Sequence, residues 1–251
     1  MKILVPLKRV PDPDTRIRLQ PDGAGIETDG VKFAVNPFDA IALEEALRMR
    51  ESQPGLEIVV VTLGGEEAIE QLRTGLAMGA DRAVLIRTSP SLDSLAVAKV
   101  LAACFRRELP DAVFMGKQAI DDDSNQAGQM LAGLLGIGQA TFVSGLEIAA
   151  GARRARCRRE TDAGIEIIEV GLPAVFTTDL RLNEPRYVSL PGIMKARKKP
   201  IEEVTLADLG TEAVSRTTVV RLELPPRRKA GQRVRTVDEL ISKLRLEAKV
   251  I

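Results

Sequence analysis

Short apolar runs alternate with stretches of helical periodicity over the first half of the chain. Four apolar runs are candidate buried strands: residues 2–7, 57–64, 82–87 and 112–116. Three segments between them carry apolar residues mainly on one face and are candidate helices: residues 39–51, 66–78 and 93–109. Regular alternation of strands and helices predicts a parallel sheet covered by helices, with ligands bound at the carboxyl ends of the strands.

The pattern changes after about residue 143. The stretches "SGLEIA", "RRARCRRE" and "GIEIIEVG" alternate as strands of an antiparallel ribbon do, and the arginines of residues 153–159 are expected on its solvated face. Residues 172–182 return to the core, and residues 190–200 form a short helix or a loop. We therefore expect an α/β fold, with a parallel sheet and an antiparallel extension.

The C-terminal part reads as an appendage. Residues 217–224 resemble a strand, and residues 225–235 lack apolar periodicity and read as an extended arm. A final helix is expected over residues 236–249, where Thr236 and Glu239 have the spacing of a capping box. The expected organisation is one α/β domain over residues 1–224 followed by an arm and helix over residues 225–251.

Composition removes several classes of function. The 251 residues carry a net charge of +1, no Trp and one Tyr, so a nucleic-acid partner is not expected. Histidine is absent, which removes the commonest general base and metal ligand. The two cysteines, Cys104 and Cys157, are far apart, which fits a reducing compartment and excludes a structural zinc site. Residues 1–7 are too short for a signal peptide, and no apolar run has membrane-spanning length, so we expect a cytoplasmic protein without membrane insertion.

The stretch "GKQAIDDDSNQAGQM" places three consecutive aspartates, Asp121 to Asp123, before a candidate helix. A magnesium site, a catalytic carboxylate pair and a helix cap are the alternatives. We favour the cap, with Asp123 as N-cap and Gln126 at the third helical position, because no second acidic cluster completes a metal site. Gly128 costs helix stability of about 1 kcal/mol relative to alanine, and it lets a ligand phosphate or ribose approach the backbone.

A second helix start is specified around residue 36. Asn36 is the expected N-cap, Pro37 the first helical residue and Asp39 the third. The two helix starts and the strand end at residues 61–64 are suited to enclosing one nucleotide, although each start is also explained as a helix cap alone. The GxGxxG, GxxxxGK[ST] and GxSxG motifs are absent from the sequence. The expected site is therefore not an ordinary dinucleotide-binding motif, the phosphate loop of an ATPase or the nucleophile elbow of a hydrolase.

Longer motifs carry a family resemblance. The segments "VPLKRVPDPD", "NPFDAIALEEALRMRE", "LAMGADRAVLI", "GKQAIDDDSNQAGQMLAGLLG" and "ETDAGIEIIEVGLPAVFTTDLRLNEPRYVSLPGIMKARKKPI" together resemble the beta-subunit family of electron transfer flavoproteins. The resemblance extends over essentially the whole chain. It implies an adenine-nucleotide-hydrolase-like (Rossmann-like) domain, in an electron-carrier subunit that is not itself an enzyme.

The resemblance also implies cofactors and partners. The family works as a heterodimer in which FAD is held mostly by the alpha subunit, while the beta subunit holds a structural AMP and wraps the alpha subunit with its C-terminal arm. A loop of the beta subunit docks acyl-CoA dehydrogenases, and the heterodimer passes their electrons to the electron transfer flavoprotein-quinone oxidoreductase of the membrane. In eukaryotes the family is found in the mitochondrial matrix.

The family's site residues are transferred to the matching positions of this sequence. The AMP site then comprises Pro6, Asn36, Pro37, Phe38, Asp39, Leu63, Asp121, Asp122, Asp123, Ser124, Asn125, Gln126, Ala127, Gly128, Gln129, Met130, Leu131 and Ala132. The docking loop covers residues of about 184–200, with Leu190 as an exposed apolar anchor, or alternatively as a core leucine. Its expected contacts also include Pro191, Ile193, Met194 and Lys195.

Three alternatives remain beside this reading. Electron-bifurcating relatives carry a second FAD in the AMP site, although residues 116–129 resemble the AMP type. An adenine-nucleotide-hydrolysing enzyme or ATP binder on the same fold is a second alternative. It needs a glycine-rich loop that binds phosphate or a metal site, and neither appears in the sequence. A structural partner that uses AMP only to fill its core is the third. The identity of the bound nucleotide distinguishes AMP, FAD and ATP.

Overall fold

The computed structural model describes residues 1–89, 92–226 and 230–251. The chain forms two units: residues 1–17 with 28–218, and residues 18–27 with 219–251. The boundary therefore falls a few residues before the expected position 224. Residues 18–27, far earlier in the sequence, group with the C-terminal arm.

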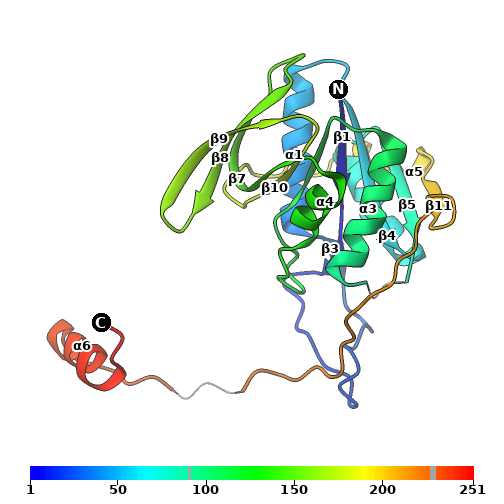
Figure 1. The fold of residues 1–251 in the computed structure, drawn as a ribbon. Helices are drawn as coiled ribbons and strands as arrows, with labels where there is room; N and C mark the ends of the chain where they lie inside the picture. Colours follow the sequence, from blue (N-terminus) through cyan, green and yellow to red (C-terminus); the bar gives the residue numbers. More distant parts are fainter. Residues whose placement is uncertain (90–91, 227–229) are drawn as a thin grey trace. The chain divides into compact units, whose positions relative to one another are not determined.

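The larger unit is built on a nine-stranded sheet in the order β11-β5-β4-β1-β6-β10-β7-β8-β9 (Figure 1). Its strands are β1 (Lys2–Pro6), β4 (Glu57–Gly64), β5 (Arg82–Arg87), β6 (Ala112–Gly116), β7 (Gly138–Glu147), β8 (Arg154–Thr161), β9 (Gly164–Gly171), β10 (Ala174–Thr178) and β11 (Glu202–Thr205). The strands from β11 to β7 pair in parallel, and β8 and β9 extend the sheet antiparallel. This architecture confirms the expected α/β fold with an antiparallel extension.

Helices cover both faces of the sheet. They are α1 (Pro37–Ser52), α2 (Ile69–Met78) after a 3-10 turn η1 (Glu66–Ala68), α3 (Ser94–Glu108), α4 (Ala127–Leu135) and α5 (Leu190–Lys198). Apolar residues of α1 and α2 share one buried cluster with Ile3, and those of α3 and α4 share another with Leu4. Successive residues of β1 thus point to opposite faces, as expected of a strand buried on both sides.

The antiparallel extension follows the alternation of its sequence. In β8, Ala155 and Cys157 are buried, while Arg154, Arg156 and Arg158 are exposed. Two of these arginines pair with neighbouring acids, Arg154 with Glu169 at 3.5 Å and Arg156 with Glu147 at 3.7 Å. The prediction of a solvated face is confirmed for four of the five arginines; Arg159 is half-buried and donates to Thr141.

Some strand assignments differ from the sequence-based expectations. Residues 217–224 form no strand, because a β-branched stretch becomes one only where a sheet edge is available to pair with it. Conversely, β11 pairs with β5 at the edge of the sheet and was not anticipated. A separate antiparallel pair, β2 (Arg9–Pro11) with β3 (Phe33–Val35), was also not anticipated.

The smaller unit contains few regular elements. The backbone N–H of Leu222 donates to the carbonyl of Gly23 at 2.9 Å, which joins the two segments of this unit. Helix α6 (Val237–Lys243) continues into a π-helical turn η2 (Leu244–Ala248). The Thr236 hydroxyl accepts from the Glu239 backbone N–H at 3.2 Å, as a capping box predicts. The Glu239 carboxylate accepts from the Arg235 N–H at 3.0 Å and not from the Thr236 N–H, so only half of the predicted box is formed.

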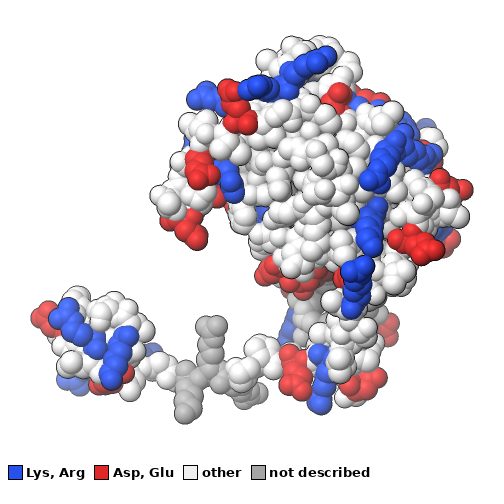
Figure 2. Space-filling model, viewed as in Figure 1, with Lys and Arg blue, Asp and Glu red and all other residues white. Residues whose placement is uncertain are grey.

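The surface carries both signs of charge. On the face of the larger unit seen in Figure 2, Lys and Arg lie among Asp and Glu around an uncharged area over α4. This mixture agrees with the net charge of +1. Among the residues that the structure describes, no helix is long and apolar enough to cross a membrane.

Candidate functional site

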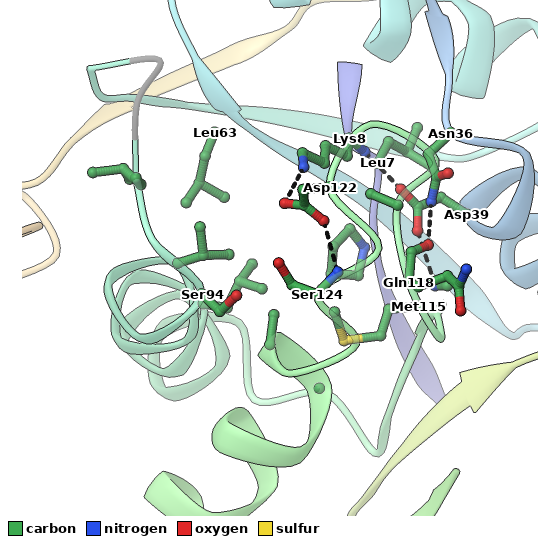
Figure 3. A pocket seen from close by; sticks show the side chains of 18 of the residues that line it. Leu7, Lys8, Asn36, Asp39, Leu63, Ser94, Met115, Gln118, Asp122 and Ser124 are labelled. Atoms are coloured by element: carbon green, nitrogen blue, oxygen red, sulfur yellow. Dashed lines mark hydrogen bonds and ion pairs between the residues drawn. The ribbon is translucent and has the colours of Figure 1, made fainter. Parts of the chain in front are cut away.

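A pocket lies at the carboxyl ends of four adjacent strands, in the order β5-β4-β1-β6 (Figure 3). Since β4 and β6 flank β1 on opposite sides, this is where strand order reverses, which is the usual position of ligand sites in such sheets. Its lining includes the ends of β1 and β4, the residues after β5 and β6, and the starts of α1, α3 and α4. The start of α1, the strand end at residues 61–64 and the start of α4, which lies three residues later than predicted, therefore meet at one site.

Asp39, in the first turn of α1, holds two strand ends together. Its carboxylate accepts from the backbone N–H of Lys8 at 2.7 Å and from that of Gly116 at 2.9 Å. Burial raises the pKa of Asp39 to about 6, against the opposing effect of these hydrogen bonds. The side chain thus fixes the spacing between the ends of β1 and β6 at the floor of the pocket.

Asn36 occupies the N-cap position of α1, but its side chain makes no cap hydrogen bond. The side-chain amide instead donates to the Gln118 carbonyl at 2.9 Å, and its oxygen accepts from the Ile120 backbone N–H at 3.3 Å. The predicted start of the helix is confirmed, with Asn36 at the N-cap position. The Asn36 side chain, however, binds the loop after β6 and not the helix.

Two side chains, those of Lys8 and Gln118, bind the three aspartates of that loop. The Lys8 ammonium donates to Asp121 at 2.8 Å and to Asp122 at 2.9 Å, and the Gln118 amide donates to Asp123 at 2.7 Å. Burial raises the pKa of Asp122, but hydrogen bonds from Ser124 and Lys8 outweigh it and leave the pKa lowered. The aspartates therefore tie the loop to itself and to the end of β1. Figure 3 shows the contacts of Asp122 with Lys8 and Ser124.

The capping interpretation of Asp123 is wrong. Helix α4 begins at Ala127 with Gln126 as N-cap, and Asp123 has a φ of 49°, outside the helix. The Asp123 side chain is engaged by Gln118, so the loop turns once more before the helix starts. As a result the N-terminus of α4 has no side-chain cap and no acidic residue in its first turn.

Gly128 lines the pocket and also packs closely on the sheet. A Cβ atom at Gly128 would lie 2.6 Å from Thr177 Cγ2 and 3.2 Å from Met115 Sδ. The group that approaches this glycine is therefore the side-chain layer of the sheet beneath α4. Close packing of the helix on β10 and β6 explains the absence of a side chain.

The pocket brings together many of the expected nucleotide-site residues. Those that line it are Pro6, Asn36, Asp39, Leu63, Asp122, Ser124, Asn125, Gln126, Ala127 and Gly128. The expected residues outside its lining are Pro37, Phe38, Asp121, Asp123, Gln129, Met130, Leu131 and Ala132. Leu131 and Ala132 are fully buried on the side of α4 that packs on the sheet.

Several lining residues were not identified from the sequence. They include Leu7, Lys8, Thr88, Ser89, Ser94, Lys117 and Gln118. The Thr88 hydroxyl is buried with no hydrogen-bond partner among the described residues. Thr88 and Ser89 could have been identified from their position directly after β5, because the carboxyl ends of neighbouring parallel strands lie at the same edge of the sheet.

The chemistry of the pocket suits a ligand with an apolar part and an anionic part. Leu63, Leu92 and Val97 provide apolar walls. The N-terminus of α4, which has no side-chain cap among the described residues, presents backbone N–H groups and the positive end of the helix dipole. Among the described residues, no group of His, Cys, Asp or Glu side chains is arranged to hold a metal ion. The two cysteines are buried, which raises the pKa of Cys104 to about 12 and that of Cys157 to about 11.

The expected docking segment is a short helix on the surface. Leu190 begins α5 and is 78% exposed, and Met194, one turn later, is also exposed. The alternative that Leu190 is a core residue is therefore wrong. Three basic residues, Lys195, Arg197 and Lys198, lie in the last turn of the same helix.

Comparisons with known proteins agree with this architecture. Residues 24–209 match the family described as "Electron transfer flavoprotein domain". The chain is 52% identical over 251 residues to the electron transfer flavoprotein subunit beta of Bradyrhizobium diazoefficiens and 50% identical over 251 residues to the mitochondrial one of Arabidopsis thaliana, covering 100% of each protein and of this chain. It is 46% identical to the Homo sapiens subunit beta over 249 residues, 98% of this chain and 97% of that protein. The chain belongs to the beta-subunit family of electron transfer flavoproteins and is an electron-carrier subunit without catalytic activity of its own.

Proposed function

We propose that this chain pairs with an electron transfer flavoprotein alpha subunit and holds a structural AMP in the pocket at the carboxyl ends of β5, β4, β1 and β6. The observation that carries the AMP assignment is the combination of apolar walls with the uncapped N-terminus of α4. An adenine ring suits the walls, and a phosphate suits the backbone N–H groups of the helix. FAD, the redox-active group, is held mostly by the alpha subunit.

In this proposal the nucleotide is structural and holds the segments around the pocket together. Five chain segments converge on the pocket, and a ligand that contacts all of them stabilises their arrangement through its binding free energy. Histidine is absent from the chain and both cysteines lie outside the lining, so the pocket holds neither a nucleophile activated by histidine nor a thiol. We therefore assign the AMP no chemical step.

The heterodimer accepts electrons from dehydrogenases that dock on α5, with acyl-CoA dehydrogenases as the proposed donors and a membrane quinone oxidoreductase as the acceptor. The exposed pair Leu190 and Met194 supports an apolar contact at the centre of the interface. The basic last turn of α5 supports a partner surface with acidic residues around that contact. The proposed location is the bacterial cytoplasm, or the mitochondrial matrix in a eukaryote, as the names of the plant relatives indicate for those proteins.

Co-expression with an alpha subunit tests the assignment. The complex is purified, denatured and analysed for released nucleotides by mass spectrometry. Equimolar AMP and FAD is the expected result. FAD without AMP, at twice the amount per heterodimer, would establish the bifurcating alternative, and ATP would establish a nucleotide-hydrolase-like protein.

A further inference from the structure

The docking helix α5 rests on α2 through backbone contacts. A Cβ atom at Gly192 would lie 2.7 Å from the carbonyl oxygen of Ala77, so the two helices approach as closely as a glycine permits. Ala196 lies on the same side of α5 and is 2% exposed. With α5 seated on this side, Leu190 and Met194 remain on the exposed side.

One side chain of α2 holds the end of α5. The Arg73 guanidinium Nη1 donates to the carbonyl oxygens of Ala196 at 2.6 Å and Lys199 at 2.5 Å. Arg73 is half-buried, and no carboxylate lies within ion-pair distance of it among the described residues. Its charge is directed at the C-terminal carbonyls of a helix, where a cation is favoured by the helix dipole.

The contact is reciprocal. The Lys199 ammonium, just after α5, donates to the carbonyl oxygen of Ala80 at 2.7 Å, just after α2. Arg73 of α2 therefore binds the C-terminal end of α5, and Lys199, the residue after α5, binds the chain just after α2. At the N-terminal end, the Ser189 hydroxyl accepts from the Gly192 N–H at 3.2 Å and caps α5.

We propose that Arg73 is a positioning residue for dehydrogenase docking, because its hydrogen bonds to the end of α5 fix the orientation in which Leu190 and Met194 are presented. This inference rests on the proposed docking function of α5. A small helix held in one orientation binds a partner more tightly than a mobile one, since less conformational entropy is lost on association. Arg73 itself need not contact the partner.

The test uses the complete heterodimer as the substrate of an acyl-CoA dehydrogenase. Arg73→Ala is expected to raise the KM for the flavoprotein by about tenfold, the order of loss for a charge-assisted hydrogen-bond pair, with kcat within about twofold. Arg73→Lys, which keeps the charge and one possible hydrogen bond, is expected to restore part of the loss. Arg106→Ala, which removes an exposed arginine from α3, is the matched control and should leave KM unchanged.

A readout without the dehydrogenase separates the inference from the docking function. Backbone hydrogen exchange over residues 190–199 should accelerate in Arg73→Ala, with FAD and AMP content unchanged. Unchanged exchange in α5, or an unchanged KM while Leu190→Ala raises it, would overturn the role of Arg73. If Leu190→Ala leaves KM unchanged, docking on α5 fails instead, and the exchange result still decides whether Arg73 holds the helix.

A double variant provides the last check. If Arg73 acts by positioning Leu190, the effects of Arg73→Ala and Leu190→Ala on KM are less than additive in free energy. Full additivity would show that the two residues act independently and would overturn the positioning role.

Discussion

The carboxylate of Asp39 accepts a hydrogen bond of 2.9 Å from the backbone N–H of Gly116, 77 residues further along the chain. The same carboxylate accepts from the Lys8 N–H on the neighbouring strand end. A buried acid in a helical first turn is thereby used to join two parallel strands at the floor of the pocket.

This arrangement makes stability depend on pH through Asp39. Its pKa is raised by burial from 3.8 to about 6, so the folded chain holds this proton more tightly than the unfolded chain does. The corresponding stabilisation is fully present below about pH 4 and is lost as pH rises through 6, on the order of 3 kcal/mol. The unfolding free energy of the parent relative to Asp39→Asn should therefore decrease between pH 4 and 7. A difference that grows with pH would contradict the raised pKa.

Lys8 should control the release of bound nucleotide. Its ion pairs with Asp121 and Asp122 hold the loop after β6 against the end of β1. Lys8→Met removes both pairs, which are partly exposed, and should accelerate AMP release from the heterodimer by roughly two- to fivefold. Lys32→Met, at an exposed position, is the control. Added salt should accelerate release from the parent more than from Lys8→Met, and equal salt dependence would count against the mechanism.

Two glycines of α4 should respond in opposite directions to alanine. Gly128→Ala places a methyl group against the buried Thr177 and should destabilise the chain by about 1–3 kcal/mol. At Gly133 a Cβ meets no atom within 4 Å, so Gly133→Ala should stabilise the helix by up to about 1 kcal/mol. Thermal melting of both variants measures this contrast. A neutral Gly128→Ala would show that the helix can move off the sheet.

The C-terminal part of the smaller unit, residues 219–251, should be required for assembly with the alpha subunit. A chain ending after Thr218 keeps the backbone hydrogen bonds of Arg216 and Thr217 to Asp93, and it should fold with near-parental melting. It should fail to co-purify with the flavin-bearing subunit. The charge-introducing pair Leu240→Asp and Ile241→Asp tests the half-exposed apolar side of α6 at full length. An intact heterodimer from the shortened chain would refute this role.

Leu190 should act in partner binding and not in folding. Because Leu190 is 78% exposed, Leu190→Ala should leave melting, FAD content and AMP content nearly unchanged. It should weaken electron transfer from an acyl-CoA dehydrogenase by at least about tenfold through binding. Leu109→Ala alters another leucine of similar exposure, 74%, and serves as the control. Equal effects of the two variants would remove the special role of α5.

Charge reversal at the end of α5 should act differently from loss of the apolar anchor. Lys195→Glu with Lys198→Glu should slow electron transfer mainly at low ionic strength, because exposed charges steer association and are screened by salt. Stopped-flow rates at low and high salt measure this effect. A rate loss that persists undiminished at high salt would indicate a short-range contact instead.

The sequence by itself determined the alternation of strands and helices. The apolar runs at residues 57–64, 82–87 and 112–116 coincide with β4, β5 and β6, because strands buried on both faces leave a continuous local signal. The long motifs were sufficient to place the chain in its family. They also placed much of the pocket, since two helix starts and a strand end are features of local sequence.

Only the tertiary structure decided what the polar side chains of the site contact. The first-turn position of Asp39 and the run of three aspartates both suggested helix capping, yet their partners are Lys8, Gly116 and Gln118. The same holds for Gly128, whose close neighbour is Thr177 on a strand far along the chain. Local spacing specifies which groups a helix end can use, but the order of strands in the sheet determines which distant groups come within hydrogen-bonding distance.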